Sequence, residues 1–412
     1  MRVIKQAPTN IPEPDVKNED KKEYEIELLT PLYGGGATTG VNDPTFPIRP
    51  TSVRGQLRFW WRATQGARYT SSKELFEKEK EIWGSTDEPS STIVYVKSPS
   101  WPKSRDFVGG RNDNYEFKRF GPEAYVLFPA AADTNRHNLV REGLKFKISV
   151  SYNKNFKDDV LCAVWAWVNF GGIGARTRRG CGALYCEEMA PKNPEGFTDW
   201  FEHAIKTYGL ELGTTREWPT LSRRILTGRA VDSSLTAWKN AIIPMKEFRQ
   251  GENVGRNKGR MPNRPGRSRW PEPDTMRRAF KMHSTGHPPS DEMPDGFPRA
   301  AFGLPILFRF VGSRGDPDCD LYPKISKRMG SPMILRPLKT QEGRNAPLIA
   351  FLEAPPSGDL ELKQTGVAAT TIKSSKIKDS NFAAYPNSPM SRSRKGCALE
   401  AFYEYLKTKG WR

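Results

Sequence analysis

A glycine- and arginine-rich segment between Val168 and Cys186 limits what this chain can fold into. Five glycines and three arginines occupy the twelve residues from Gly171 to Gly182, between an apolar helix-like run and a short β-like run. Glycines allow positive φ angles and let a backbone approach a ligand closely, and arginines donate forked hydrogen bonds that suit phosphate. The segment therefore predicts an exposed polyanion-binding loop, with contacts at Gly172, Gly174, Arg176, Arg178 and Arg179. A flexible glycine turn without a ligand is the alternative.

Two nucleotide-binding motifs do not fit this segment. The stretch from Gly172 to Thr177 lacks the third glycine of the dinucleotide fingerprint, and a helix rather than a strand precedes it. No Gly-Lys-Ser/Thr sequence follows to form a Walker loop. A nucleic-acid backbone therefore fits better than a mononucleotide. We expect a glutamate at Gly174 to weaken RNA binding without unfolding the chain.

The charge of the whole chain favours the same kind of partner. The 412 residues include 65 Lys and Arg against 47 Asp and Glu, which gives a formal net charge of +18 and a pI near 9.6. Such a chain attracts RNA or DNA. No apolar run is long enough to cross a bilayer, and neither a secretory signal nor a basic amphipathic helix at a terminus is recognisable. We therefore expect a cytoplasmic protein without a membrane partner.

Cysteine and histidine usage gives no sign of a metal site or a disulfide framework. The chain has five cysteines, an odd number, and none of them forms a Cys-x-x-Cys pair. We therefore expect reduced and mostly buried thiols. His283 and His287 have the spacing of a helical metal pair, but Gly286 and the following prolines oppose a helix there. We expect no metal and no cofactor.

Hydrophobic patterning in the first half predicts an α+β unit. The expected elements are a strand at 24–29, a helix at 53–65, strands at 92–96 and 144–150, a helix at 158–170 and a strand at 183–186. A further strand is expected at 125–128. This β-α-β-β-α-β order is that of ferredoxin-like domains, which include RNA-recognition domains.

The length of the chain predicts a second domain, because single cores seldom grow past about 250 residues. Helices are expected at 197–208 and 233–248, and strands at 301–310, 333–338 and 348–351. The resulting division is a polar tail over 1–21, a first domain over 22–190 that ends in the glycine-rich loop, and a second domain over 191–412 with a basic insertion at 249–278.

That basic insertion is rich in Gly, Pro and Arg. Trp270 favours a segment that orders on a partner over a solvated linker. The candidate RNA-binding residues in this half are Arg267, Arg269, Trp270, Arg277, Arg278, Arg299, Lys327 and Arg328. Docking of a neighbouring protein subunit is a rival role for the stretch SRWPEPDTMRR (268–278).

A second group of arginines lies on the expected first helix. Arg54, Arg58 and Arg62 form a stripe that begins in the first turn, where a cation opposes the helix dipole, and the helix itself supplies no acidic partner. An anionic ligand would offset this charge, and carboxylates from elsewhere in the chain are the alternative. Trp60 or Trp61 is a candidate for base stacking, although core packing suits at least one of them.

Five blocks of sequence, together with the glycine-rich loop, resemble a known family. The blocks are TPLYGGGAT (30–38), IRPTSVRGQLRFWWR (48–62), SRWPEPDTMRR (268–278), FPRAAFGLPILF (297–308) and RMGSPMILRPL (328–338). They resemble the RAMP superfamily of CRISPR-associated proteins, and within it the first-numbered RAMP subunit of the Cmr, or type III-B, effector complex. The resemblance covers most of the chain.

This resemblance implies two tandem ferredoxin-like domains, one in each half of the chain, and a non-catalytic RNA-binding subunit in antiviral defence. Such subunits lie at the head of the complex near the 3′ end of the guide RNA, beside the second head subunit and the terminal backbone subunit. The implied ligands are guide RNA and, as a further candidate, target RNA. A metal-independent RAMP endoribonuclease that processes guide RNA is the alternative, with His203 and the nearby Tyr208 as candidates. In those enzymes, however, the glycine loop lies near the C-terminus.

Overall fold

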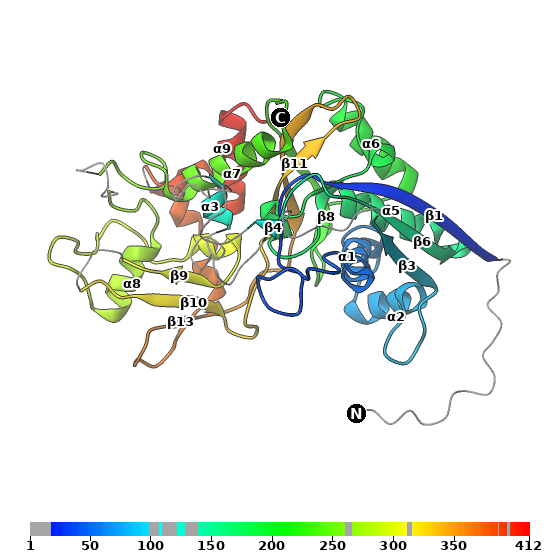
Figure 1. Ribbon diagram of the computed structural model, residues 1–412. Helices are drawn as coiled ribbons and strands as arrows, with labels where there is room; N and C mark the ends of the chain where they lie inside the picture. Colours follow the sequence, from blue (N-terminus) through cyan, green and yellow to red (C-terminus); the bar gives the residue numbers. More distant parts are fainter. Residues whose placement is uncertain are drawn as a thin grey trace.

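The structure is a computed structural model that describes residues 18–98, 107–108, 122–127, 139–259, 266–310, 315–385, 387–393 and 396–412. It combines helices with antiparallel sheets, as expected for an α+β protein. Figure 1 shows β1 (Glu19–Leu28), α1 (Pro50–Ala63), β6 (Lys145–Asn153) and α5 (Lys157–Phe170) at one side of the molecule. At the other side lie α8 (Glu272–Phe280), β9 (Ile306–Phe308) and β10 (Cys319–Pro323), with α3 (Pro122–Val126), α7 (Ser234–Gln250) and α9 (Ala398–Thr408) between the two. Within the described residues, no helix is long and apolar enough to span a membrane.

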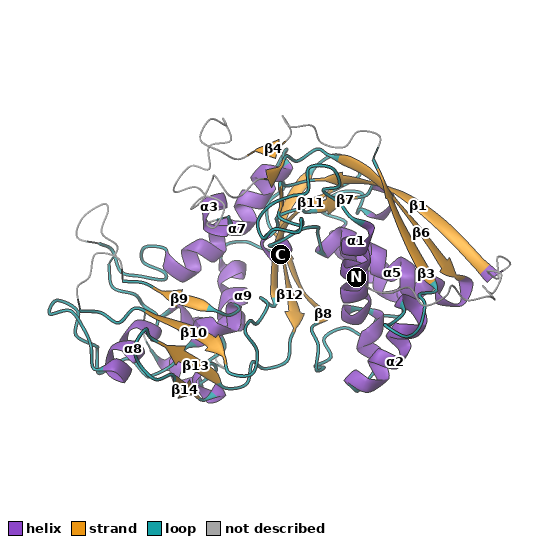
Figure 2. Ribbon diagram, turned by 60° about the horizontal axis from the view of Figure 1, so that its bottom comes forward, coloured by secondary structure: helices purple, strands orange, loops and turns teal. Residues whose placement is uncertain are grey.

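The first half is built around one four-stranded sheet. Its strands are β1 (Glu19–Leu28), β3 (Thr92–Lys97), β6 (Lys145–Asn153) and β7 (Leu184–Tyr185), in the spatial order β3-β6-β1-β7. Helices α1 (Pro50–Ala63) and α5 (Lys157–Phe170) pack on one face, where Leu57 and Trp167 join Ile26 and Ile148 in the core (Figure 2). The chain order is thus β1-α1-β3-β6-α5-β7. Because β1 begins at Glu19, the expected polar tail ends earlier than residue 21.

Local sequence explains these elements. In β1 the residues alternate between exposed and buried, as expected for a strand with one face on a core. Helix α5 has Asp158 and Asp159 in its first turn, is apolar on nearly all sides, and ends at Gly171. Helix α2 (Ser72–Trp83) was not predicted, although Ser71 caps it by accepting a hydrogen bond from the Glu74 amide at 3.2 Å.

The strand predicted at 125–128 is wrong. Pro122–Val126 form a short helix, α3, which packs against α7 (Ser234–Gln250); Phe128 lies outside the described residues. A short apolar run fits a strand or a buried helical turn equally well, and Pro122 at the first helical position favours the helix. Nearby, β2 (Leu32–Tyr33), β5 (Leu139–Val140) and β4 (Phe107–Val108) form a small sheet in that order.

The second half contains a three-stranded sheet in the order β11-β12-β8. Its strands are β8 (Thr220–Thr227), β11 (Met333–Lys339) and β12 (Asn345–Glu353), and its helices α7 and α9 (Ala398–Thr408) share a core that includes Phe248, Phe351 and Phe402. At the other edge of β8, Thr227 and Arg412 exchange backbone hydrogen bonds of 2.7 and 3.1 Å. Helix α6 (Phe197–Tyr208) packs on α5 through Trp200 and Phe201.

A separate four-stranded sheet lies at the far end of the second half. It has the order β14-β13-β10-β9 and consists of β9 (Ile306–Phe308), β10 (Cys319–Pro323), β13 (Leu360–Lys363) and β14 (Thr370–Ile372) (Figure 2). Helix α8 (Glu272–Phe280) contributes Met276 to its core. The strand expected at 301–310 is therefore shorter, because Gly303 and Pro305 interrupt the apolar run.

Candidate nucleic-acid interface

The glycine-rich segment is a packed turn between α5 and β7. Its backbone donates hydrogen bonds within the chain, from Ile173 to Gly182 (2.9 Å), from Ala175 to Tyr33 (2.7 Å) and from Gly182 to Pro31 (2.9 Å). The first and last residues of the segment are buried, whereas Gly174 to Arg179 are partly or fully exposed. Only the stretch from Gly174 to Arg179 is therefore accessible to a ligand.

Gly172 and Gly174 are required by the packing of the turn. Gly174 has φ +84°, and a Cβ atom there would lie 2.7 Å from the Gly34 carbonyl oxygen and 2.8 Å from that of Tyr33. A Cβ at Gly172 would lie 2.7 Å from the Gly182 oxygen. These glycines let the turn approach its own backbone. The expectation that glutamate at Gly174 would leave the fold intact is therefore wrong, and their contact with RNA stays a prediction.

The three arginines of the segment join it to other parts of the chain. Arg176, with φ +59°, donates to the Val126 carbonyl at 2.9 Å. Arg178 donates to the Ser331 carbonyl and lies over the Phe59 ring at 5.2 Å, and Arg179 donates to the Phe302 carbonyl at 3.3 Å. Burial lowers the pKa of both Arg178 and Arg179 to about 10. These side chains have structural partners, which a purely RNA-facing loop would lack.

The arginine stripe of α1 has the partners that the alternative interpretation required. Glu79 of α2, whose side chain is 2% exposed, accepts hydrogen bonds from Arg58 Nε (2.6 Å) and Arg62 Nε (2.7 Å). Arg54 donates to the carbonyl of Trp83. Trp60 is buried and packs near Phe170, so in this structure it belongs to the core and offers no face for stacking.

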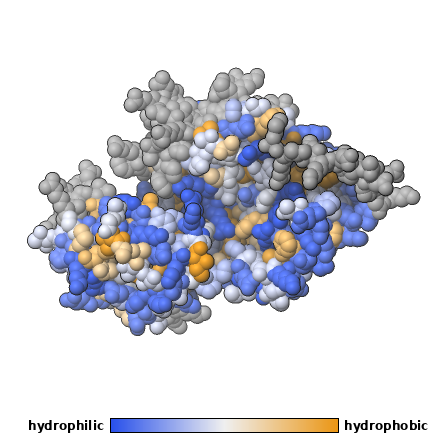
Figure 3. Space-filling model, turned by 90° about the horizontal axis from the view of Figure 1, so that it is seen from below, coloured by the Kyte–Doolittle hydropathy of each residue, from blue (hydrophilic) through white to orange (hydrophobic). Residues whose placement is uncertain are grey.

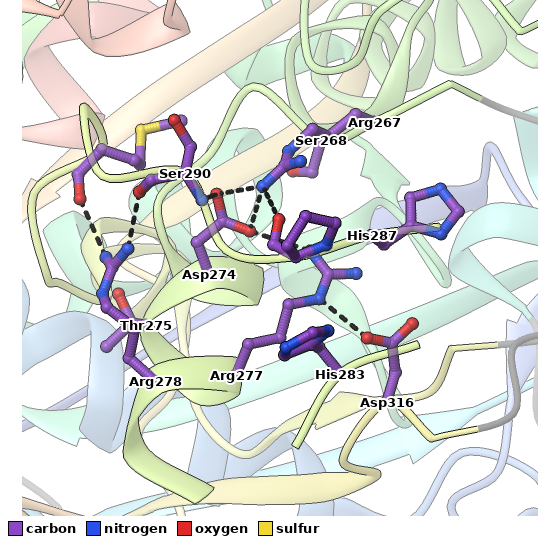
Figure 4. Close-up of polar contacts among 12 residues, drawn as sticks. Arg267, Ser268, Asp274, Thr275, Arg277, Arg278, His283, His287, Ser290 and Asp316 are labelled. Carbon is purple, nitrogen blue, oxygen red and sulfur yellow. Dashed lines mark hydrogen bonds and ion pairs between the residues drawn. The ribbon is translucent and has the colours of Figure 1, made fainter. Parts of the chain in front are cut away.

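The arginines around α8 are neutralised largely by nearby carboxylates (Figure 4). Arg267 and Arg277 point toward Asp274, and Arg277 also binds Asp316, with distances of 2.7 to 2.8 Å. Arg278 pairs with Asp295, and Arg269 donates to the side chain of Asn257. Near this network, His287 Nδ1 lies 3.2 Å from the Ser284 hydroxyl.

Trp270 corrects the prediction that the basic insertion orders on a partner. Its ring is 1% exposed and packs against Phe248 and Phe302, and its Nε1 donates to the Arg249 carbonyl at 3.0 Å. The described part of the insertion therefore orders on this chain, because burial of the indole in an aromatic cluster stabilises it locally. Of the remaining candidates, Lys327 and Arg328 are exposed, and Arg299 lies 3.2 Å from Glu272.

A cavity of about 530 Å³ brings several arginines together. We call it the arginine pocket and define it by its six lining arginines, Arg249, Arg256, Arg267, Arg277, Arg299 and Arg309. Tyr125 and Phe308 also line it. Sequence reasoning selected three of the six and missed Arg249, Arg256 and Arg309, although the first two lie in the segment that it marked as basic.

Sequence reasoning also missed Arg336, which supports the glycine-rich segment. Its side chain is 1% exposed and donates from β11 to the carbonyls of Val168 (2.7 Å), Gly171 (3.0 Å) and Leu184 (2.6 Å). These carbonyls flank the segment on both sides. Burial lowers the pKa of Arg336 to about 9, so the hydrogen bonds must offset a large desolvation cost.

The residues of the enzyme alternative lie in different environments. His203 is on the exposed side of α6, with Nε2 3.4 Å from the Thr207 hydroxyl. Tyr208 packs against Trp165, and burial raises its pKa. In the described part of the chain, no three His, Cys, Asp or Glu side chains are grouped so that they could hold a metal ion. None of the five cysteines forms a disulfide, and four of them are buried.

A comparison with models of protein families finds a match in the first half of the chain. Residues 25–185, which run from β1 to β7, match the model of the RAMP superfamily. We refer to these matched residues as the RAMP domain. The glycine-rich segment lies at the C-terminal end of the RAMP domain, and Arg336, from outside it, holds the segment in place.

Two Cmr1 subunits of the CRISPR system Cmr from Pyrococcus furiosus confirm the narrower resemblance. The chain is 29% identical to Cmr1-2 over 176 residues, which are 39% of this chain and 92% of that protein. It is 26% identical to Cmr1-1 over 169 residues, which are 40% of this chain and 46% of that protein. The chain is similar, therefore, to RAMP proteins of the Cmr1 type.

Solved structures of the same system align with much of the chain. Apo Cmr1 from P. furiosus aligns over 85% of this chain and 89% of its own, with 18% identity and a TM-score of 0.47. A chain in the type III-B Cmr-β complex bound to cognate target RNA aligns over 93% of this chain and 99% of its own, with 10% identity and a TM-score of 0.48.

Proposed function

We propose that this protein is a non-catalytic, RNA-binding subunit of a type III-B CRISPR effector complex in the cytoplasm. In this proposal it lies at the head of the complex near the 3′ end of the guide RNA. Its protein partners are the second head subunit and the terminal backbone subunit. The observation that carries the proposal is the 29% identity to Cmr1-2, which extends over 92% of that protein.

The fold supports this proposal. We interpret the chain order β1-α1-β3-β6-α5-β7, with the strand order β3-β6-β1-β7, as a ferredoxin-like domain. We interpret β8-α7-β11-β12-α9 as a second such domain, in which the backbone of Arg412 pairs beside β8 at the position of a last strand. The separate sheet of β9, β10, β13 and β14 is then an insertion into the second domain.

Charge also supports RNA as the ligand. The chain carries a net charge of +18, and the arginine pocket gathers six guanidinium groups. The face shown in Figure 3 is largely hydrophilic, with hydrophobic residues in separate small patches. Such a face is suited to the polar contacts of a nucleic acid.

Copurification tests the proposal directly. A tagged chain is isolated from its native cell, and the bound proteins and RNA are identified by mass spectrometry and sequencing. We expect other Cmr subunits and short guide-sized RNAs that carry repeat-derived tags. A chain that emerges alone and free of nucleic acid would contradict the proposal.

Binding of the purified chain to single-stranded RNA should depend strongly on salt. If arginines neutralise about four phosphates, the slope of log K against log salt should be about −3, since each phosphate contributes roughly 0.7 for single strands. Fluorescence anisotropy with two unrelated RNA sequences measures the slope, and we expect similar affinities for both. A flat salt dependence would show that phosphate contacts do not drive binding.

The purified chain should leave labelled RNA intact over hours, with or without Mg²⁺ or Mn²⁺. The reason is that His203 is exposed and close to Thr207, whereas Tyr208 packs into the core, so the two do not converge on one site. Gel electrophoresis of labelled RNA is the measurement, and His203→Ala is the control variant. Cleavage by the wild type that disappears in this variant would favour the endoribonuclease instead.

A further inference from the structure

We propose that the arginine pocket binds a phosphate group, supplied by RNA, in direct contact with Arg249 and Arg256. The proposal rests on the proposed function for the source of the phosphate. The charge and shape of the pocket are independent of that function.

Distant parts of the chain meet at the arginine pocket. Arg249 comes from the last turn of α7 and Arg256 from the turn that follows. Arg277 comes from α8 and Arg309 follows β9. Tyr125 of α3 lines the same cavity from the RAMP domain. The pocket is therefore a feature of the folded chain, formed at the contact between its two halves.

Carboxylates neutralise four of the six arginines. Arg267 and Arg277 share Asp274, with Asp316 as a second partner of Arg277. The other two pairs join Arg309 to Asp320 at 2.6 Å and Arg299 to the fully buried Glu272 at 3.2 Å. Six arginines and four carboxylates leave two positive charges without a counter-charge among the described residues.

The two remaining charges belong to Arg249 and Arg256. Arg249 Nη1 donates to the Tyr125 hydroxyl at 2.8 Å, and Arg256 Nη2 donates to the Gln250 side chain at 3.4 Å. Both of these acceptors are neutral.

Several buried donors near the pocket lack an acceptor. In the described structure, Arg249 Nε is buried without a hydrogen-bond partner, and so is Arg179 Nη1 from the glycine-rich segment. Buried donors in folded proteins are nearly always satisfied, so these point to an absent acceptor. The pKa values are consistent with an excess of positive charge. Burial and, to a smaller extent, Arg299 lower the pKa of Arg256. Burial also lowers the pKa of Arg299, and the nearby charge of Arg249 lowers it further.

Phosphate fits this combination better than a carboxylate. Its oxygens accept from several guanidinium groups at once, and forked arginine donors match that geometry. Two uncompensated cations match either one terminal phosphate monoester or two successive phosphodiesters, each with a total charge near −2. A terminal phosphate and an internal backbone are thus two sources of the same chemistry.

The test compares single arginine variants that remove the same charge at different places. Arg249→Gln and Arg256→Gln change the pocket. Arg223→Gln is the matched control, because Arg223 is 57% exposed on β8, pairs with Glu202, and does not line the pocket. Circular dichroism and the thermal midpoint establish that each variant folds. Within the described residues, the Arg256 guanidinium donates only the 3.4 Å hydrogen bond to Gln250, so its variant serves if Arg249→Gln fails to fold.

The first measurement uses inorganic phosphate and adenosine monophosphate as probes, with thermal unfolding at constant ionic strength. We expect both probes to raise the melting temperature of the wild type and of Arg223→Gln more than chloride does. This gain should disappear in Arg249→Gln and Arg256→Gln. No gain in the wild type, or equal gains in all the variants, would overturn the phosphate site.

The second measurement uses three RNAs of one sequence, with a 5′ phosphate, a 3′ phosphate or hydroxyl groups at both ends. Loss of one charge-assisted contact predicts about tenfold weaker binding for Arg256→Gln than for Arg223→Gln. If the variant loses affinity for only one of the phosphorylated RNAs, the pocket binds the terminal phosphate at that end. If it loses affinity equally for all three RNAs, the pocket binds the internal backbone. If the pocket variants lose the stabilisation by inorganic phosphate but bind RNA as the wild type does, RNA is not the source of the phosphate. In that case the anion site and the proposed function both stand. If all three variants bind RNA equally well and with the same salt dependence, the proposed function stands. The arginine pocket is then not where RNA binds.

Discussion

Replacement of Gly182 by alanine should prevent stable folding of the RAMP domain. Gly182 has φ +64°, and a Cβ atom there would lie 2.0 Å from the Ile173 carbonyl oxygen, which is backbone and cannot rotate away. The left-handed conformation alone costs about 1 kcal/mol for alanine. The clash would also break the Ile173–Gly182 and Gly182–Pro31 hydrogen bonds that close the turn. We expect a loss of more than about 4 kcal/mol in the free energy of unfolding, measured by urea denaturation.

Gly209→Ala is the matched control for this prediction. Gly209 also has a left-handed conformation, with φ +58°, but beyond its own chain neighbours no residue places an atom within 4 Å of the position of its Cβ. Its variant should lose only the conformational term, about 1 kcal/mol. Equal losses in the two variants would show that the turn around Gly182 adapts to a side chain and that its packing is looser than described.

Replacement of Arg336 by methionine should destabilise the chain by about 3 to 5 kcal/mol, because three buried carbonyls lose their donor at roughly 1 to 3 kcal/mol each, less the desolvation cost of the guanidinium that methionine removes. The side chain donates to three carbonyls that flank the glycine-rich segment, and methionine would leave the oxygens of Val168, Gly171 and Leu184 without this donor. Arg336→Lys should lose nearly as much, because one ammonium group cannot reproduce the planar fork of donors. Denaturation followed by tryptophan fluorescence measures both losses.

Arg224→Met provides the comparison for Arg336. Arg224 lies on β8 and pairs with Glu353 at 2.9 Å, but its side chain is 35% exposed, so we expect a loss below about 1 kcal/mol. If Arg336→Met were no more destabilising than Arg224→Met, the buried guanidinium would not be what joins β11 to the RAMP domain. If Arg336→Met left the free energy of unfolding unchanged, the hydrogen bonds of the guanidinium would only offset the cost of its desolvation.

Local sequence was sufficient for the elements with strong periodicity. Helix α6 has the predicted bounds, 197–208, and β3, β6, α5 and β11 differ from their predictions by at most a few residues at either end. These elements depend on the alternation of apolar residues and on nearby Asp, Gly and Pro. The β-α-β-β-α-β order of the first half and the resemblance to RAMP proteins follow from the same local patterns. The cap Ser71 to Glu74 was also a readable signal, and would have revealed α2.

The partners of the arginines depend on tertiary structure. Sequence identified a basic chain and the segments where its arginines lie, but the partner of Arg178 is 153 residues away and that of Arg336 is 168 residues away. Glu79 belongs to a helix that sequence reasoning missed, and it pairs two of the arginines assigned to RNA. Propensity depends on a few neighbouring residues, whereas burial and charge pairing depend on contacts between distant segments. The sequence by itself thus determined most of the elements and the positive net charge. The fold decided that, in the described structure, Arg249 and Arg256 lack a carboxylate partner while the other four arginines of the arginine pocket pair with carboxylates.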